Sequence, residues 1–175
     1  MIAIYYTKFD TSELTRGQVR STESLLSRKL LRYVLVRFHG MSEPLPTVEV
    51  AGNDKPYLSD RSFEFNVTHS GGVVVLAVSD ESIGIDIEKT DRVIRQKIFE
   101  TYLHTPNGTI EDWTKFESYS KLSGGGIYSV SYPPKESGVF FKIYTEDVPG
   151  FTVCVCTKKD RFPQNVSYID KEELA

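Results

Sequence analysis

Apolar and polar side chains alternate along several short segments of this 175-residue chain, and this alternation predicts half-buried strands. The predicted strands cover residues 1–6, 47–51, 63–67, 73–78, 83–88, 139–145 and 151–157. Turns are predicted at Gly52-Asn53-Asp54 and Ser70-Gly71-Gly72, because these residue types accept turn conformations. The runs 63–67, 73–78 and 83–88 follow one another after short turns and therefore predict a three-strand meander.

Between the predicted strands lie segments whose apolar residues recur at helical spacing. This spacing predicts a first long helix over residues 22–38, which ends at Gly40. A weaker pattern at 94–102 predicts a short helix, and a further helix is predicted over 109–122. The glycines that begin at Gly124 provide the C-terminal stop of that last helix.

The order of these elements predicts the fold class. Strands, a long helix and a pair of strands come first, and a weaker version of the same order follows after residue 88. This order predicts an α+β fold of two similar, pseudo-duplicated halves, 1–88 and 89–175, packed into one compact body. A chain of this length has room for a good hydrophobic core in one such body.

Composition narrows the classes of function. The chain has a net charge of −3, and its basic residues are scattered, so we expect no nucleic-acid partner. No apolar run approaches the length of a membrane span, and the first residues predict a strand rather than a signal peptide. We therefore expect a cytoplasmic protein that does not bind membranes. Cys154 and Cys156 lie on one face of a predicted strand, and their spacing favours buried thiols over a metal or redox pair.

Acidic residues supply the candidate chemistry. In the strand 83–88 three isoleucines share one face, and Asp86 and Glu88 project together from the other. On the helix 109–122, Glu117 and Lys121 stand one turn apart. The pair Glu117–Lys121 is open to two interpretations, a solvated salt bridge or a third oxygen ligand beside a cation that neutralises an anionic substrate. Three carboxylates suit Mg²⁺, which binds oxygen ligands together with substrate phosphates.

Four ordered motifs carry a resemblance to a known family. They are Lys55-Pro56-Tyr57-Leu58, Phe65-Asn66-Val67-Thr68-His69-Ser70, Ile83-Gly84-Ile85-Asp86-Ile87-Glu88 and Trp113-Thr114-Lys115-Phe116-Glu117-Ser118-Tyr119-Ser120-Lys121. A glycine-rich segment, Gly124-Gly125-Gly126-Ile127, follows them. In this order the motifs resemble the signature of the 4′-phosphopantetheinyl transferases, and most closely the surfactin-synthetase-activating (Sfp-like) type, whose members are monomers built from two similar halves.

The resemblance implies an enzyme of the holo-acyl-carrier-protein synthase type. It implies transfer of the 4′-phosphopantetheine group from coenzyme A to a serine of an acyl or peptidyl carrier protein, with release of adenosine 3′,5′-bisphosphate. By position, the Mg²⁺ ligands would be Asp86, Glu88 and Glu117. The nucleotide and its 3′-phosphate would be held by Lys55, Thr68 and His69, and the pyrophosphate by Lys121. Glu117 would also be the base for the attacking serine.

Three departures from the family pattern keep other functions open. Phe116 stands directly before Glu117, where the family usually has lysine, and Thr68 replaces the usual serine. The region 94–111, which helps the family to receive the carrier protein, is shortened. One alternative is a non-catalytic relative that binds coenzyme A or a carrier protein; another is an unrelated metal-dependent phosphoesterase. The carrier protein and its pathway are not specified by these motifs.

Overall fold

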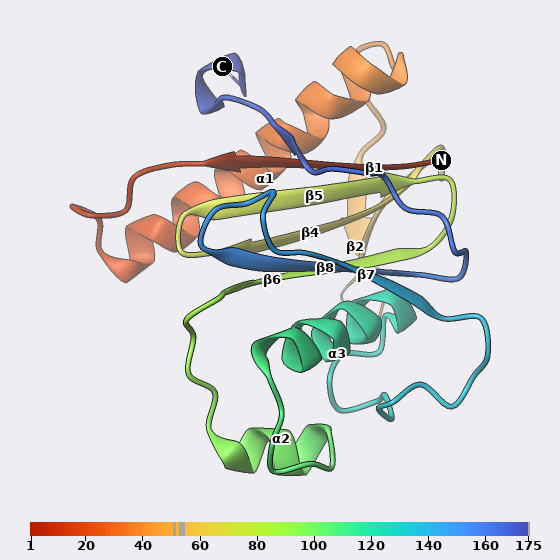
Figure 1. Ribbon diagram of the computed structural model, residues 1–175. Coiled ribbons are helices and arrows are strands. Elements are labelled where there is room, and N and C mark those ends of the chain that lie inside the picture. Colours follow the sequence, from red (N-terminus) through yellow and green to blue (C-terminus); the bar gives the residue numbers. More distant parts are fainter. Residues whose placement is uncertain (51, 53–54, 175) are drawn as a thin grey trace.

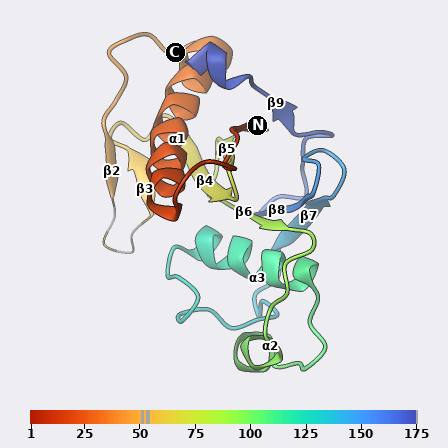
Figure 2. The same ribbon diagram turned by 90° about the vertical axis from the view of Figure 1, so that its left-hand side faces the viewer.

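The computed structural model describes residues 1–50, 52 and 55–174, whose helices and sheets stack in layers (Figure 1). Along the chain the elements are β1 (Ile2–Lys8), α1 (Arg16–His39), β2 (Val48–Val50), β3 (Pro56–Leu58), β4 (Glu64–Ser70), β5 (Val73–Ser79), β6 (Ile83–Lys89), α2 (Gln96–Tyr102), α3 (Ile110–Ser123), β7 (Phe140–Tyr144), β8 (Phe151–Thr157), β9 (Ser167–Tyr168) and the 3₁₀ helix η1 (Lys171–Leu174). Helix α1 covers one sheet, α3 covers a second, and α2 lies beyond α3 (Figures 1 and 2). The architecture is mixed α/β and compatible with the predicted α+β class.

The first sheet has the strand order β4-β5-β1-β9. Strand β5 is antiparallel to both of its neighbours, and β9 runs parallel to β1. Every residue of β5 is buried because both faces of the sheet are covered. On one face Leu76 packs with Leu30 and Val34 of α1, and on the other Val75 packs against the second sheet. The predicted β4–β5 hairpin is confirmed, with Gly71 and Gly72 at positive φ in its turn.

The second sheet has the order β6-β8-β7, with β8 antiparallel to both neighbours. The predicted meander is therefore wrong in its third strand, since β6 pairs with β8 and not with β5. The physical reason is that β4 and β1 already occupy both edges of β5. The isoleucine face of β6 still packs as predicted, because Ile83, Ile85 and Ile87 fill the core between the two sheets.

The helices follow the sequence pattern with one shift. Helix α1 begins at Arg16, six residues before the predicted start, because Thr15 and Gln18 form a capping box there. It ends at Gly40, as predicted, in a left-handed cap. The predicted turn at Gly52-Asn53-Asp54 lies largely outside the described residues. Among those described, no helix combines the length and apolarity that a membrane span requires.

Helix α3 packs very closely onto β6 at Gly84. A Cβ added to this glycine would lie 2.0 Å from the carbonyl oxygen of Ser118 and 2.5 Å from the amide nitrogen of Leu122. A side chain at position 84 would therefore hold the two backbones apart. This contact fixes the height of α3 above the strand that carries Asp86 and Glu88.

The two cysteines of β8 also face α3. Cys154 and Cys156 are both free and fully buried. The hydroxyl of Ser118 donates a hydrogen bond to the Cys154 sulfur at 3.4 Å, and Cys156 packs against Leu122. Burial raises the pKa of the Cys154 thiol to about 12, so it stays protonated at neutral pH. The prediction of buried thiols on one strand face is confirmed.

Candidate active site

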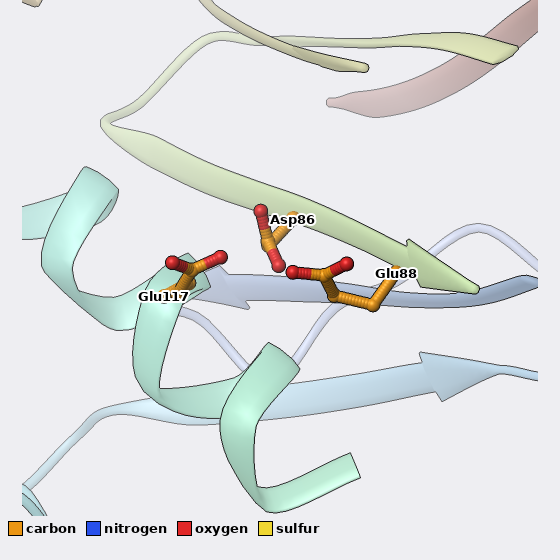
Figure 3. A group of neighbouring side chains, drawn as sticks. All are labelled: Asp86, Glu88 and Glu117. Atoms are coloured by element: carbon orange, nitrogen blue, oxygen red, sulfur yellow. The ribbon is translucent and has the colours of Figure 1, made fainter. Parts of the chain in front are cut away.

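Three carboxylates converge between β6 and α3. Asp86 and Glu88 point from the outer face of β6, and Glu117 points toward them from α3 (Figure 3). One oxygen from each lies within 4.8 Å of the others. Asp86 and Glu88 are 2% and 4% exposed, so the cluster concentrates negative charge out of water. Sequence reasoning named these three residues together, and the structure places them together.

Burial and mutual repulsion perturb the acids of this cluster. Burial, followed by the charge of Asp86, raises the pKa of Glu117 to about 8. Burial also raises the pKa of Glu88, while its ion pair with Arg92 acts in the opposite direction. Asp86 Oδ2 is buried without a hydrogen-bond partner. These residues can hold a cation, and their oxygen donors are of the kind that a hard divalent ion such as Mg²⁺ prefers.

Lys121 supplies a positive charge at the rim of the cluster. Its Nζ donates to Asp86 Oδ1 at 2.7 Å and to Thr68 Oγ1 at 3.0 Å, and Thr68 Oγ1 itself lies 3.3 Å from Asp86 Oδ1. No ion pair joins Glu117 to Lys121 within the part of the chain that the structure describes. Lys121 of α3 therefore pairs with Asp86 of β6, and not with Glu117 in the solvated salt bridge that the i,i+4 spacing allowed.

His69 approaches the same pocket from the other face of β4. Alternation along the strand turns Thr68 toward β6 and its neighbour His69 toward α1. The imidazole is 43% exposed, and its Nδ1 lies 2.9 Å from Glu23 Oε2. A pocket of about 300 Å³ is lined by both faces at this edge of the sheet, including Thr68, His69, Asp86, Glu117 and Lys121.

Lys55 lies away from the carboxylates. Its Nζ donates to Ser82 Oγ at 3.0 Å and to the Ile83 carbonyl oxygen at 3.3 Å. Burial lowers the pKa of this lysine. It lines a second pocket of about 210 Å³ that also contains Lys121 and Val67. Val67 and Lys121 border both pockets, so the two hollows adjoin and a long ligand can reach from Lys55 to the acids.

Three further residues support the site, and two of them, Arg92 and Glu23, were not singled out from the sequence. Asn66 accepts a hydrogen bond from the Ile85 amide at 3.0 Å and so ties β4 to β6. Arg92 pairs with Glu88, and Glu23 of α1 pairs with His69. Asn66 lies inside one of the four motifs, whereas Glu23 looks like any polar helix residue until α1 is placed over the sheet.

Phe116 is part of the core. The side chain is 0% exposed, and its ring lies 5.4–5.8 Å from the rings of Trp113, Tyr102 and Tyr132. The residue that departs from the family pattern thus anchors α3 onto an aromatic cluster shared with α2. Phe116 therefore packs this helix inside the protein and does not face the carboxylates.

Comparison with known proteins identifies relatives of the chain. No protein-family model matches the chain. The chain is 27% identical to the 4′-phosphopantetheinyl transferase psf-1 of Bacillus pumilus, over 98% of this chain and 86% of that protein. Identity to the 4′-phosphopantetheinyl transferase Sfp of Bacillus subtilis (strain 168) is 26%, over 86% and 80% of the two chains. The transferase gsp of Aneurinibacillus migulanus is 33% identical, over 60% of this chain and 49% of its own.

These similarities support a transferase. The resemblance drawn from the four motifs is confirmed: the chain is related to the 4′-phosphopantetheinyl transferases, of the Sfp-like type.

Proposed function

We propose that the protein transfers the 4′-phosphopantetheine group from coenzyme A to a serine of an acyl or peptidyl carrier protein, with Mg²⁺ as cofactor. The observation that carries the proposal is the convergence of Asp86, Glu88 and Glu117 beside Lys121 in one pocket. The relationship to 4′-phosphopantetheinyl transferases supports the same reaction.

The three carboxylates would hold Mg²⁺, which would neutralise pyrophosphate charge and polarise the reacting phosphorus. The orphaned Asp86 Oδ2 and the raised pKa of Glu117 support this assignment, because both are relieved by a bound cation. Lys121 would hold the pyrophosphate from the opposite side. The Thr68 hydroxyl, which accepts from Lys121 Nζ at 3.0 Å and donates to Asp86 Oδ1 at 3.3 Å, would orient both of these side chains.

In the proposed reaction the serine Oγ forms a bond to the phosphorus that carries pantetheine. The bond from that phosphorus to the bridging oxygen breaks, and adenosine 3′,5′-bisphosphate leaves with the electron pair. Glu117 would take the serine proton as the general base. Lys121 stabilises charge on the departing oxygen.

The binding groove is proposed to run along the edge of β4. The pocket at Lys55 adjoins the pocket of the acids at Val67 and Lys121, which supports an extended ligand lying across both. His69 would receive the 3′-phosphate on the α1 side of the edge. Lys121 would receive the pyrophosphate on the α3 side, next to Thr68.

We also propose the pseudo-duplication that the sequence suggested. Two features support it: the strand orders β4-β5-β1 and β7-β8-β6 match, and each sheet has a central antiparallel strand and one covering helix. The division between 88 and 89 stays a prediction. Strand β6 precedes that point, yet it pairs with β8.

The test is the intact mass of an apo carrier protein after incubation with this protein, coenzyme A and Mg²⁺. We expect a gain of one phosphopantetheine group that disappears when the metal is chelated. Asp86→Asn and Glu117→Gln should abolish the gain, while Glu111→Gln, an exposed acid on the same helix, should not. Coenzyme A binding without any mass gain, on carriers of both fatty-acid and peptide type, would instead indicate a non-catalytic relative.

A further inference from the structure

A buried carboxylate on α1 lies behind the site. Glu23 is 4% exposed, although it belongs to a helix that otherwise buries aliphatic residues. One carboxylate oxygen, Oε1, accepts a hydrogen bond from the Gly72 amide at 3.1 Å. The other, Oε2, lies 2.9 Å from His69 Nδ1. A buried acid is costly unless its oxygens are paired, and here both are.

The position of His69 explains why such a partner matters. The residue lies near the end of β4, the edge strand of its sheet, on the face opposite to Thr68. A half-exposed imidazole at an edge can rotate away into solvent. The bond to Glu23 holds Nδ1 against α1, so the other nitrogen, Nε2, is turned away from Glu23. In the part of the chain that the structure describes, Nε2 has no hydrogen-bond partner.

We propose that Glu23 is a positioning residue for His69, fixing the imidazole so that Nε2 is presented to the 3′-phosphate of coenzyme A. This inference rests on the proposed function for the identity of the ligand. A histidine donates to a phosphate from Nε2 when both ring nitrogens carry protons, and Glu23 accepts the Nδ1 proton of that form. At metal sites a carboxylate commonly orients a ligating histidine through its second nitrogen, and the same arrangement is proposed here for a histidine that binds phosphate.

A variant of Glu23 can distinguish a role in orienting His69 from a role in stabilising the fold. Glu23 would stabilise the hairpin turn through the Gly72 amide whether or not His69 binds a ligand. A Glu23→Gln variant keeps an oxygen for Gly72 but loses the charge that faces Nδ1. A structural role alone would therefore change the stability of this variant without a selective effect on ligands that carry the 3′-phosphate.

Steady-state kinetics of phosphopantetheine transfer test this inference. We expect Glu23→Gln to raise KM for coenzyme A about tenfold with little change in kcat, by the usual effect of removing such a partner. KM for 3′-dephospho-coenzyme A should stay the same, and in a His69→Ala background Glu23→Gln should have no further effect. Glu13→Gln, an exposed acid that precedes the same helix, serves as the matched control. An unchanged KM for coenzyme A, or an equal rise with both donors, would overturn the inference.

Nitrogen-15 spectra of the imidazole side chains give a second test that needs no activity. The chain has 3 histidines, so His69→Ala identifies the His69 signals directly. We expect a protonated Nδ1 in the unmodified protein and a shift of that signal in Glu23→Gln. A wild-type Nδ1 without its proton contradicts the inference. If no transfer is detected but Nδ1 of His69 is protonated and its signal depends on Glu23, the proposed function is wrong. The bond by which Glu23 orients the imidazole is then still supported.

Discussion

Replacing Gly84 with alanine perturbs the contact that sets α3 above β6. The new Cβ would lie 2.0 Å from the Ser118 carbonyl oxygen and 2.5 Å from the Leu122 amide nitrogen. Cβ atoms essentially never approach other heavy atoms closer than 3.0 Å. Both neighbours are helix backbone, which cannot rotate aside, so α3 must withdraw by about 1 Å or more.

Two consequences follow from that displacement. Overpacking of this kind costs about 1–3 kcal/mol of unfolding free energy. Glu117 and Lys121 move with the helix while Asp86 and Glu88 stay on β6, and a misplacement near 1 Å can reduce a catalytic rate about 100-fold. We therefore expect Gly84→Ala to lower both the free energy of unfolding and the rate of phosphopantetheine transfer.

Denaturant unfolding and the carrier-protein mass assay measure the two effects. Gly17→Ala is the control, because Gly17 lies in α1 with no atom within 4 Å of an added Cβ. Alanine there should be neutral or should stabilise the helix by about 0.5–1 kcal/mol. If Gly84→Ala keeps the stability and the transfer rate of the wild type, the close contact does not assemble the site.

Three further outcomes are expected. Without metal, Glu117 has its pKa raised from an ordinary 4.5 to about 8, so the folded state binds the extra proton and stability falls as pH rises from about 4.5 through 8. Denaturation at a series of pH values with chelator should show the free energy of unfolding falling by a few kcal/mol, at about 1.4 kcal/mol per pH unit. In Glu117→Gln this dependence on pH should largely disappear. Mg²⁺ at 100 times its Kd should stabilise the wild type by about 2.7 kcal/mol, whereas a similar rise in Asp86→Asn would contradict the metal assignment. Phe116→Lys, which restores the usual family residue, should cost at least about 3 kcal/mol because it empties the aromatic cluster and buries a charge; a soluble variant of normal melting temperature would refute this.

The burial of Phe116 argues against an expectation drawn from the sequence alone. Because the family usually has lysine at this position, the sequence alone suggests that Phe116→Lys would leave activity equal or higher. The structure places the ring at 0% exposure among Tyr102, Trp113 and Tyr132, so the position has no room for a solvated charge. Its neighbour Lys115 is half-buried on another side of the helix.

Local patterns in the sequence were sufficient for most of the helices and longer strands and for the candidate carboxylates, but not for β3, β9 or η1. Period-two alternation put Asp86 and Glu88 on one face of a strand, and the boundaries of α3 followed from Thr109 and Gly124 at its caps. Such features depend on neighbours within a few residues, so they can be read along the chain. The motif order then identified the family relationship before any contact was known.

Only the tertiary structure decided how distant segments meet. The partner of β6 proved to be β8, about 70 residues away, since the edges of β5 were already occupied. The partner of Lys121 proved to be Asp86 rather than Glu117, because Gly84 lets α3 approach β6. Glu23 gained its place behind His69 when α1 packed over the sheet. These contacts arise from packing between elements far apart in the chain, which local periodicity does not specify.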